Sequence, residues 1–325
     1  MPLPLLVALV AALIQLKGPP LSGGILSGSA SIRLEKASGG DTPVLTWSSR
    51  AGVVRLLLDT GASSTLVTPA LAQRLALSSQ ALSSQDLELG GGGSLCAALK
   101  PRRTRLPSLQ LAGLEQVGAL RLSGIEALLL PVAALPPGID GVLGIPSLRQ
   151  LPLWIDPQHN RLAFGPAALQ AARDHDSRGR GSWGRGGDRS GSGSFEAIPL
   201  RWRRGVPLLA LNNPGASVSA LADTGAEGLF ISPALAARLQ PQSPAQPLRL
   251  AGVCGEQAVE LRRYGGLALQ GADPARTVPA AVEAIRLENP IFAQLGVEAI
   301  VGQELLRNRP QLWRLERQPP RLELR

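Results

Sequence analysis

The chain has 325 residues, enough for two domains that each bury a core, and 44% of them are hydrophobic, which excludes a disordered protein. Aromatic residues make up only 3%, so aliphatic side chains must fill the interior. The net charge of +9 comes from scattered arginines that lack interleaved aromatics for stacking bases, so we expect no nucleic-acid partner.

The chain begins with an uncharged apolar run, residues 3–16, which has the length of a signal peptide and is short for a membrane span. Small residues follow, and Gly28, Ser29 and Ala30 suit a cleavage site. The sequence therefore predicts a leader over residues 1–30 and a protein that is periplasmic, extracellular or anchored through this segment. An N-terminal strand is the alternative.

An internal repeat organises the rest of the sequence. Residues 53–75 and 217–239 align without a gap and share D-T-G-A followed by P-A-L-A-x-R-L. A second pair of similar blocks, 139–148 and 297–306, follows at nearly equal spacing. Agreement in order, spacing and sequence predicts a duplicated unit.

The two copies are separated by a stretch of another composition. Gly, Ser and Arg dominate residues 173–194, where apolar residues are almost absent. This composition predicts a flexible, solvated linker between a first lobe over residues 31–172 and a second lobe over residues 195–325.

Each copy is predicted to be mostly β, because short apolar or alternating runs are broken by Gly and Pro. A short helix should begin after each of Thr68 and Ser232, since a hydroxyl residue followed by Pro is typical of a helix start. A second short helix is expected over 146–151 and 304–308. The strands predicted in the first lobe cover 42–47, 52–58, 106–111, 117–122 and 126–131.

The chemistry of the repeat lies in its two aspartates, Asp59 and Asp223. Each follows an apolar strand, and the glycine two residues later, Gly61 or Gly225, allows a sharp turn beside the carboxylate. Thr60 and Thr224 can donate hydrogen bonds across an interface between the loops. A pseudo-twofold association would bring both carboxylates to one axis, where they could bind a shared water.

These motifs resemble the retropepsin-like aspartic peptidases of clan AA. The resemblance rests on D-T-G-A at 59–62 and 223–226 and on the later V-L-G at 142–144 and I-V-G at 300–302. It covers most of the chain outside the leader and the linker. It implies two closed β-barrel lobes, similar to those of bacterial retropepsin-like proteases, joined in one chain in the arrangement of pepsins.

The resemblance implies an aspartic endopeptidase that hydrolyses peptide bonds with a water activated between Asp59 and Asp223. It implies no cofactor, no metal, and a two-lobed monomer that acts on peptides or proteins. The residues expected to support this site are Thr60, Gly61, Ala62, Thr224, Gly225 and Ala226. The alternative is a catalytically inactive peptide-binding or envelope-associated protein with the same fold, which casein cleavage would distinguish from the enzyme.

One flap is expected in each lobe, between the two blocks of the repeat. The proposed flap residues are Gly90, Gly91, Gly92 and Gly93 in the first lobe, and Gly252 and Val253 in the second. Cys96 and Cys254 fall in or near these flaps, and they are either unrelated small apolar residues or partners in an inter-flap disulfide. The chain's two histidines, His159 in a predicted hairpin turn and His175 in the predicted linker, are expected to be solvated and not to bind a metal.

The residue after each D-T-G predicts the pH range of activity. Ala62 and Ala226 lack the hydroxyl that could donate to the neighbouring carboxylate, which should raise the pKa values of the aspartate pair. Glu227, if it points inward, would push them in the same direction. We expect a bell-shaped rate profile at about pH 4 to 6.

Overall fold

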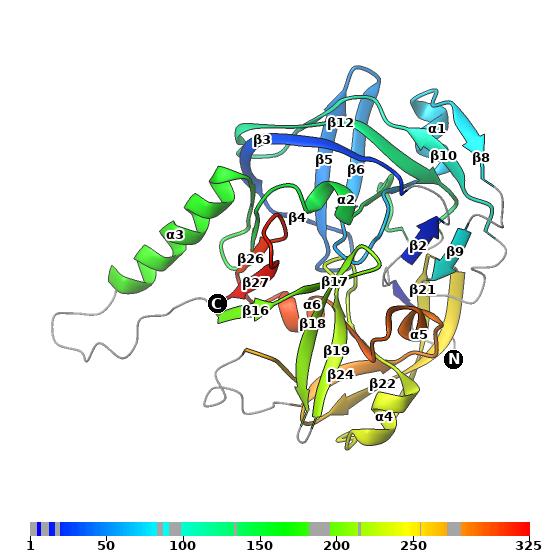
Figure 1. Ribbon diagram of the computed structural model, residues 1–325, viewed down its shortest axis with the longest axis vertical. Helices are drawn as coiled ribbons and strands as arrows, with labels where there is room; N and C mark the ends of the chain where they lie inside the picture. Colours follow the sequence, from blue (N-terminus) through cyan, green and yellow to red (C-terminus); the bar gives the residue numbers. More distant parts are fainter. Residues whose placement is uncertain are drawn as a thin grey trace.

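The computed structural model describes residues 5–7, 13–16, 20–82, 87–90, 99–132, 135–181, 196–213, 216–253, 255–271 and 281–325. The protein is mostly β, with a few short helices, and it has two lobes (Figure 1). In that view the first lobe lies at the top, the second at the bottom, and α3 extends to the left. No helix in the described part of the chain is long and apolar enough to cross a membrane.

The first lobe and the segments flanking it contain the elements up to α3. They are β1 (Leu5–Val7), β2 (Leu13–Leu16), β3 (Gly23–Arg33), β4 (Glu35–Lys36), β5 (Pro43–Ser49), β6 (Gly52–Leu58), β7 (Leu66–Val67), α1 (Pro69–Arg74), β8 (Ser79–Ala81), β9 (Leu87–Gly90), β10 (Arg102–Arg105), β11 (Leu109–Leu111), β12 (Val117–Leu129), β13 (Gly141–Leu143), α2 (Ile145–Leu148), β14 (Leu153–Asp156), β15 (Arg161–Phe164) and α3 (Pro166–Gly181).

The second lobe contains the remaining elements. They are β16 (Glu196–Pro199), β17 (Arg201–Arg203), β18 (Val206–Asn213), β19 (Ala216–Ala222), β20 (Leu229–Ile231), α4 (Pro233–Arg238), β21 (Gln246–Gly252), β22 (Gly255–Tyr264), β23 (Ala268–Leu269), β24 (Val282–Arg286), α5 (Ile291–Leu295), β25 (Ala299–Val301), α6 (Gln303–Leu306), β26 (Gln311–Arg314) and β27 (Arg321–Leu324).

The repeat in the sequence is a repeat in the structure. β6 pairs in parallel with β13 in the first lobe, and β19 pairs in parallel with β25 in the second. The predicted helix starts are confirmed, because Thr68 Oγ1 accepts from the Leu71 amide (3.2 Å) and Ser232 Oγ from the Leu235 amide (3.1 Å). The helices predicted after the second blocks correspond to α2 and α6.

The predicted strands 117–122 and 126–131 form a single strand, β12. Along its pairing with β3, Ser123 lies opposite Ile25 and Ile125 opposite Gly23, so the register is unbroken through Gly124. The φ of Gly124, +68°, is in the region that favours glycine. The sequence prediction was wrong here because it took this glycine as the end of a strand.

The small residues near position 28 lie inside a strand. β3 pairs with β12 on one side and β15 on the other, so the expected boundary after Ala30 falls within the sheet. A Cβ at Gly28 would lie 2.2 Å from the Ala119 carbonyl oxygen, which explains the requirement for glycine. Gly28 therefore serves close strand packing.

The beginning of the predicted linker is also ordered. Helix α3 continues to Gly181, so residues 173–181 are helical, whereas residues 182–195 lie outside the described part. The helix is held because Ala168 and Ala172 pack against Trp154 and Leu312 in one apolar cluster. The composition of residues 173–194 gave no sign of this, because the anchoring alanines lie at or before position 172.

The lobes share a sheet. Strand β14 of the first lobe pairs antiparallel with β26, which places Leu153 opposite Trp313. The strand order β3-β15-β14-β26-β27-β16 therefore runs from one lobe into the other. Trp154 and Trp313 are fully buried in it. The two copies are thus joined by backbone hydrogen bonds as well as by the connecting chain.

Candidate active site

The two D-T-G-A loops begin where β6 and β19 end. The Asp59 amide donates to the Leu143 carbonyl oxygen of β13 (3.2 Å), and the Asp223 amide donates to the Val301 carbonyl oxygen of β25 (2.9 Å). Each aspartate is therefore fixed by a parallel strand pair whose residues, Leu58 and Ala222 among them, are buried. The apolar strands carry the two carboxyl groups into the interior.

Four hydrogen bonds lock the loops together across the lobes. The amide of Thr60 donates to Thr224 Oγ1 (3.0 Å), and the amide of Thr224 donates to Thr60 Oγ1 (3.0 Å). In turn, Thr60 Oγ1 donates to the Ala222 carbonyl (2.8 Å) and Thr224 Oγ1 to the Leu58 carbonyl (2.9 Å). Each hydroxyl both donates and accepts, so the pseudo-twofold arrangement has a specific bonded centre.

The carboxyl groups face each other across this centre. A Cβ at Gly61 would lie 2.5 Å from Asp223 Cγ, and a Cβ at Gly225 would lie 2.4 Å from Asp59 Cγ. Each glycine therefore makes room for the carboxyl group of the opposite lobe. The amides of Gly61 (2.7 Å) and Ala62 (2.8 Å) donate to Asp59 Oδ1, and the amide of Gly225 donates to Asp223 Oδ1 (2.8 Å).

The pair is suited to hold one proton. Both aspartates are fully buried, and burial raises the pKa of Asp59 to about 6, against the lowering effect of hydrogen bonds from Asp223, Gly61 and Ala62. No N–H or O–H group of the described residues donates to Asp59 Oδ2, whereas the carboxyl of Asp223 can do so when it is protonated. Two carboxyls in contact cannot both ionise cheaply.

The cause of the raised pKa differs from the one expected from the alanines. Ala62 has no hydroxyl, but its backbone amide donates to Asp59 and lowers the pKa of that carboxyl. Burial is the largest cause of the rise. The pKa of Asp59 is raised, as expected, but the cause is burial and not the missing hydroxyl of Ala62.

Glu227 does not point at the aspartates, contrary to the conditional expectation. Its carboxylate accepts hydrogen bonds from the amides of Asp41 (2.7 Å) and Thr42 (3.0 Å) and from Thr42 Oγ1 (2.5 Å). A Cβ at Gly40 would lie 2.2 Å from Glu227 Oε1, so this turn of the first lobe fits closely around the carboxylate. Glu227 thus links the second D-T-G-A loop to the first lobe through hydrogen bonds.

Gln303 is a site residue that sequence reasoning missed. Its side-chain Nε2 donates to the Thr224 carbonyl (2.7 Å), and its amide donates to the Ala226 carbonyl (2.8 Å). In the first lobe, the amide of Ile145 donates to the Ala62 carbonyl, which is the backbone contact equivalent to that between Gln303 and Ala226. The sequence signal that could have identified Gln303 was its position directly after Gly302, the glycine that is repeated in both copies.

The predicted second flap is a hairpin that reaches the first lobe. Gly252 pairs with Gly255 at the tip of the hairpin formed by β21 and β22. Ala251 and Val253 are buried in an apolar cluster with first-lobe residues that include Ala62 and Leu128. The hairpin therefore packs on the lobe that carries the other D-T-G-A loop.

The first predicted flap is described only in part. Gly90 ends β9, whereas Gly91, Gly92 and Gly93 lie outside the described residues, as do Cys96 and Cys254.

The N-terminal strands occupy both predicted flaps. Leu5–Val7 of β1 pairs in parallel with Arg249–Ala251 of β21, and Leu13–Leu16 of β2 pairs antiparallel with Leu87–Gly90 of β9. Figure 1 places β2 and β9 between the lobes. The alternative of N-terminal strands is what the structure has at these positions.

Comparisons with known proteins found similarity to one protein family and to solved structures. Residues 51–147 match a family model described as aspartyl protease. Conglutin gamma, a basic 7S globulin from lupine seeds, is 10% identical with a TM-score of 0.48 over 91% of this chain and 94% of its own. Basic 7S globulin from soybean is 9% identical with a TM-score of 0.44 over 94% and 95%. No curated protein matches the sequence.

Proposed function

We propose that this bilobal, retropepsin-like protein is an aspartic endopeptidase that hydrolyses peptide bonds with a water activated between Asp59 and Asp223. The observation that supports it most strongly is the facing of two buried carboxyls, each held by its own D-T-G-A loop. A protein that only binds peptides has little use for two buried like charges, which cost stability unless they share a proton.

The proposed mechanism gives each carboxyl state a chemical role. In the singly protonated pair, the ionised carboxylate takes a proton from the attacking water while the protonated carboxyl donates to the scissile carbonyl oxygen. The amides of Gly61 and Ala62 hold Asp59 Oδ1, and the amide of Gly225 holds Asp223 Oδ1, so one oxygen of each carboxyl group is fixed by its own loop. As the tetrahedral intermediate collapses and its C–N bond breaks, the carboxyl that took the water's proton donates it to the leaving amine, and the other carboxylate takes a proton back from a hydroxyl of the intermediate.

The edges of β9 and β21 suit an extended peptide as substrate. In the structure these edges pair with β2 and β1, which shows that each can bind a strand. Main-chain hydrogen bonds to such edges hold a peptide irrespective of its sequence, and pockets for alternate side chains add preference. We therefore propose that substrates bind as strands between the two flaps.

The test is hydrolysis of casein and of a peptide library by chains that begin at Pro20. We expect Asp59→Asn and Asp223→Asn each to lower kcat by at least about 10³-fold, because each removes half of the acid–base pair. Asp174→Asn on α3 is the matched control and should retain activity. Substantial turnover by either single variant in a clean preparation would overturn the shared-pair mechanism.

A second measurement distinguishes an enzyme from a binding protein. A peptide in which a hydroxymethylene group replaces the scissile carbonyl mimics the tetrahedral intermediate. It should bind the wild-type chain far more tightly than the parent peptide. Equal binding of both peptides, together with no cleavage, would favour the inactive peptide-binding alternative.

A further inference from the structure

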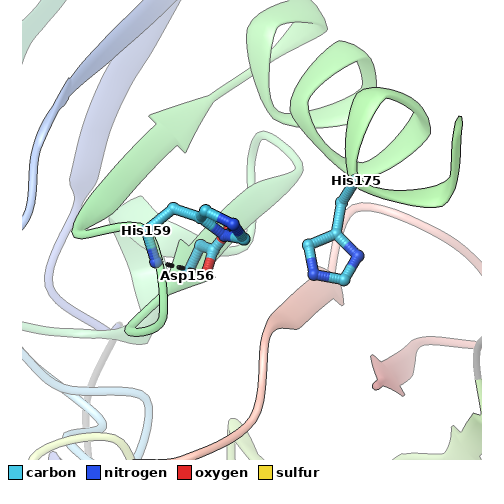
Figure 2. A group of neighbouring side chains, drawn as sticks. All are labelled: Asp156, His159 and His175. Carbon is cyan, nitrogen blue, oxygen red and sulfur yellow. Dashed lines mark hydrogen bonds and ion pairs between the residues drawn. The ribbon is translucent and has the colours of Figure 1, made fainter. Parts of the chain in front are cut away.

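A second group of ionisable side chains lies outside the aspartate pair. The only two histidines of the 325-residue chain, His159 and His175, come together with the buried Asp156. One potential ligand atom from each of the three residues lies within 4.8 Å of the other two. Figure 2 shows Asp156 and His159 on the hairpin that joins β14 to β15, and His175 reaching towards them from α3.

The hairpin holds its two members in a defined geometry. Asp156 Oδ1 accepts from the amides of Gln158 (3.1 Å) and His159 (3.1 Å), which fixes the carboxylate at the start of the turn. The other oxygen, Asp156 Oδ2, lies 2.9 Å from His159 Nδ1. The side chain of Asp156 is only 5% exposed, whereas that of His159 is 47% exposed and free to adjust.

The third member comes from the connecting helix. The imidazole rings of His159 and His175 have centroids 5.6 Å apart, and the ring of His175 also meets the buried Trp154 edge-on at 5.7 Å. The packing of α3 on Trp154 therefore sets how far His175 lies from the hairpin. His159 is exposed, as the sequence predicted, whereas His175 lies on α3 and not in a linker, because the helix continues through that position.

The space between these side chains has the size and charge for a cation. A cavity of about 20 Å³ is lined by the three residues together with Trp154, Arg161, Ala171 and Asp174, which is room for one water-sized occupant. Arg161 donates to Ser31 Oγ (2.9 Å), and Asp174 accepts from Gln170 (2.7 Å). Two carboxylates against one guanidinium leave the cavity attractive to a positive ion.

We propose that Asp156, His159 and His175 bind a divalent transition-metal cation, with zinc as the best fit. Two imidazoles and one carboxylate are ligands that zinc accepts, and water can fill a fourth position. Tetrahedral zinc needs ligand atoms about 3.3 Å apart, as follows from bonds of about 2.0–2.1 Å. The Asp156–His159 pair is already near this spacing, and the exposed ring of His159 can close on His175.

The ion would fasten the connecting helix to the shared sheet. Asp156 ends β14, which pairs with β26 of the second lobe, while His175 belongs to α3, which leads into the connection between the lobes. None of the three residues belongs to the D-T-G-A loops. The site is therefore structural, and its test does not depend on the proposed peptidase activity.

The direct test is calorimetric titration of zinc chloride into the full chain, produced without a histidine tag. Cys96 and Cys254 are replaced by serine so that thiols cannot bind the metal. We expect one zinc ion per chain with a Kd below about 10 μM. At a hundredfold excess over Kd, the melting temperature should rise by about 3–6 °C.

Variants identify the ligands. His159→Gln and His175→Gln should each weaken zinc binding by about 10- to 100-fold and abolish the thermal shift, since each removes one ligand. Asp174→Asn is the matched control, because this carboxylate lines the cavity without belonging to the three, and it should change the Kd by less than tenfold. Melting temperatures without zinc show whether each variant is folded.

Proton NMR gives an independent readout, because the chain has two histidines. Both pairs of imidazole signals should shift together as zinc is added, and reach their end points at one equivalent. The proposal is overturned if zinc fails to bind, if His175→Gln binds it as tightly as the parent chain, or if one histidine shifts without the other.

Discussion

At the scale of single residues, burial governs the candidate site more than its local sequence does. Asp59 has two backbone donors that favour its charged form, yet its pKa is raised to about 6 because the carboxyl is fully removed from water. Glu227, one residue beyond the second D-T-G-A, is instead satisfied by the Asp41–Thr42 turn. Neighbouring carboxylates thus differ in role because their surroundings differ.

The raised pKa of Asp59 predicts the alkaline limit of activity. The proposed mechanism needs one proton on the pair, and that proton is lost as the pH rises through about 6. We expect kcat/KM to be bell-shaped with its alkaline limb near pH 6. Glu227→Gln should leave this limb in place, since the carboxylate bonds to the Asp41–Thr42 turn. A limb that moves by a full pH unit in this variant would show that Glu227 acts on the pair.

The same shift predicts a pH-dependent stability. In the unfolded chain the carboxyl titrates near 3.8, but in the folded chain near 6, so the folded state binds the proton more tightly. The stability from this group is full below pH 3.8 and is lost as the pH rises through 6. Asp59→Asn, which cannot ionise, should therefore be more stable than the wild type at pH 7 by about 3 kcal/mol, and equal to it near pH 3.5.

Urea midpoints at both pH values measure this difference. Asp174→Asn, on the surface helix, provides the comparison and should show no such change with pH. An Asp59→Asn chain that is less stable than the wild type at pH 7 would contradict a costly buried charge at this position.

At the scale of elements, the N-terminal strands pair with both strands that carry predicted flap positions. Strands β9 and β21 carry the predicted flap positions Gly90 and Gly252, and both pair with N-terminal strands. A strand bound to an edge uses the donors and acceptors that a peptide substrate would need. If substrates bind at these edges as proposed, the N-terminal segment and a substrate compete for the same backbone groups.

Removal of residues 1–19 should consequently increase proteolysis. We expect a chain that begins at Pro20 to cleave casein with a lower KM than the full-length chain, because β1 and β2 no longer occupy the edges. Adding a synthetic peptide of residues 1–19 in trans should restore the higher apparent KM. Equal KM values for both chains would show that these strands do not restrict the site.

At the scale of the whole molecule, the two lobes form one structure. The shared sheet through β14 and β26 and the reciprocal Thr60–Thr224 hydrogen bonds both cross between them. Such non-local contacts hold the lobes independently of the chain that connects them.

Limited trypsin digestion tests this association. The composition of residues 182–194 predicts cleavage after Arg185 and Arg189, whereas Arg173 within α3 should be cut more slowly. The nicked halves should elute together on native gel filtration and separate only in denaturant. Separation under native conditions would mean that the shared sheet contributes little to holding the lobes.

The sequence by itself determined the features that depend on local pattern and on duplication. The two D-T-G-A loops, the capped helices after Thr68 and Ser232, and the strands β5, β6, β11 and β12 could be predicted, because strand periodicity, helix caps and an internal repeat are recorded in neighbouring residues. The facing of Asp59 and Asp223 also followed, since equivalent loops in a pseudo-twofold must meet at the axis.

Only the tertiary structure decided what depends on distant contacts. Glu227 bonds to residues 185 and 186 positions away, and Gly28 is required by the carbonyl of Ala119. His175 meets His159 because α3 packs on Trp154. No local pattern records such pairings, since each partner alone is compatible with a solvated side chain or a loop. Close packing in three dimensions selects among these possibilities.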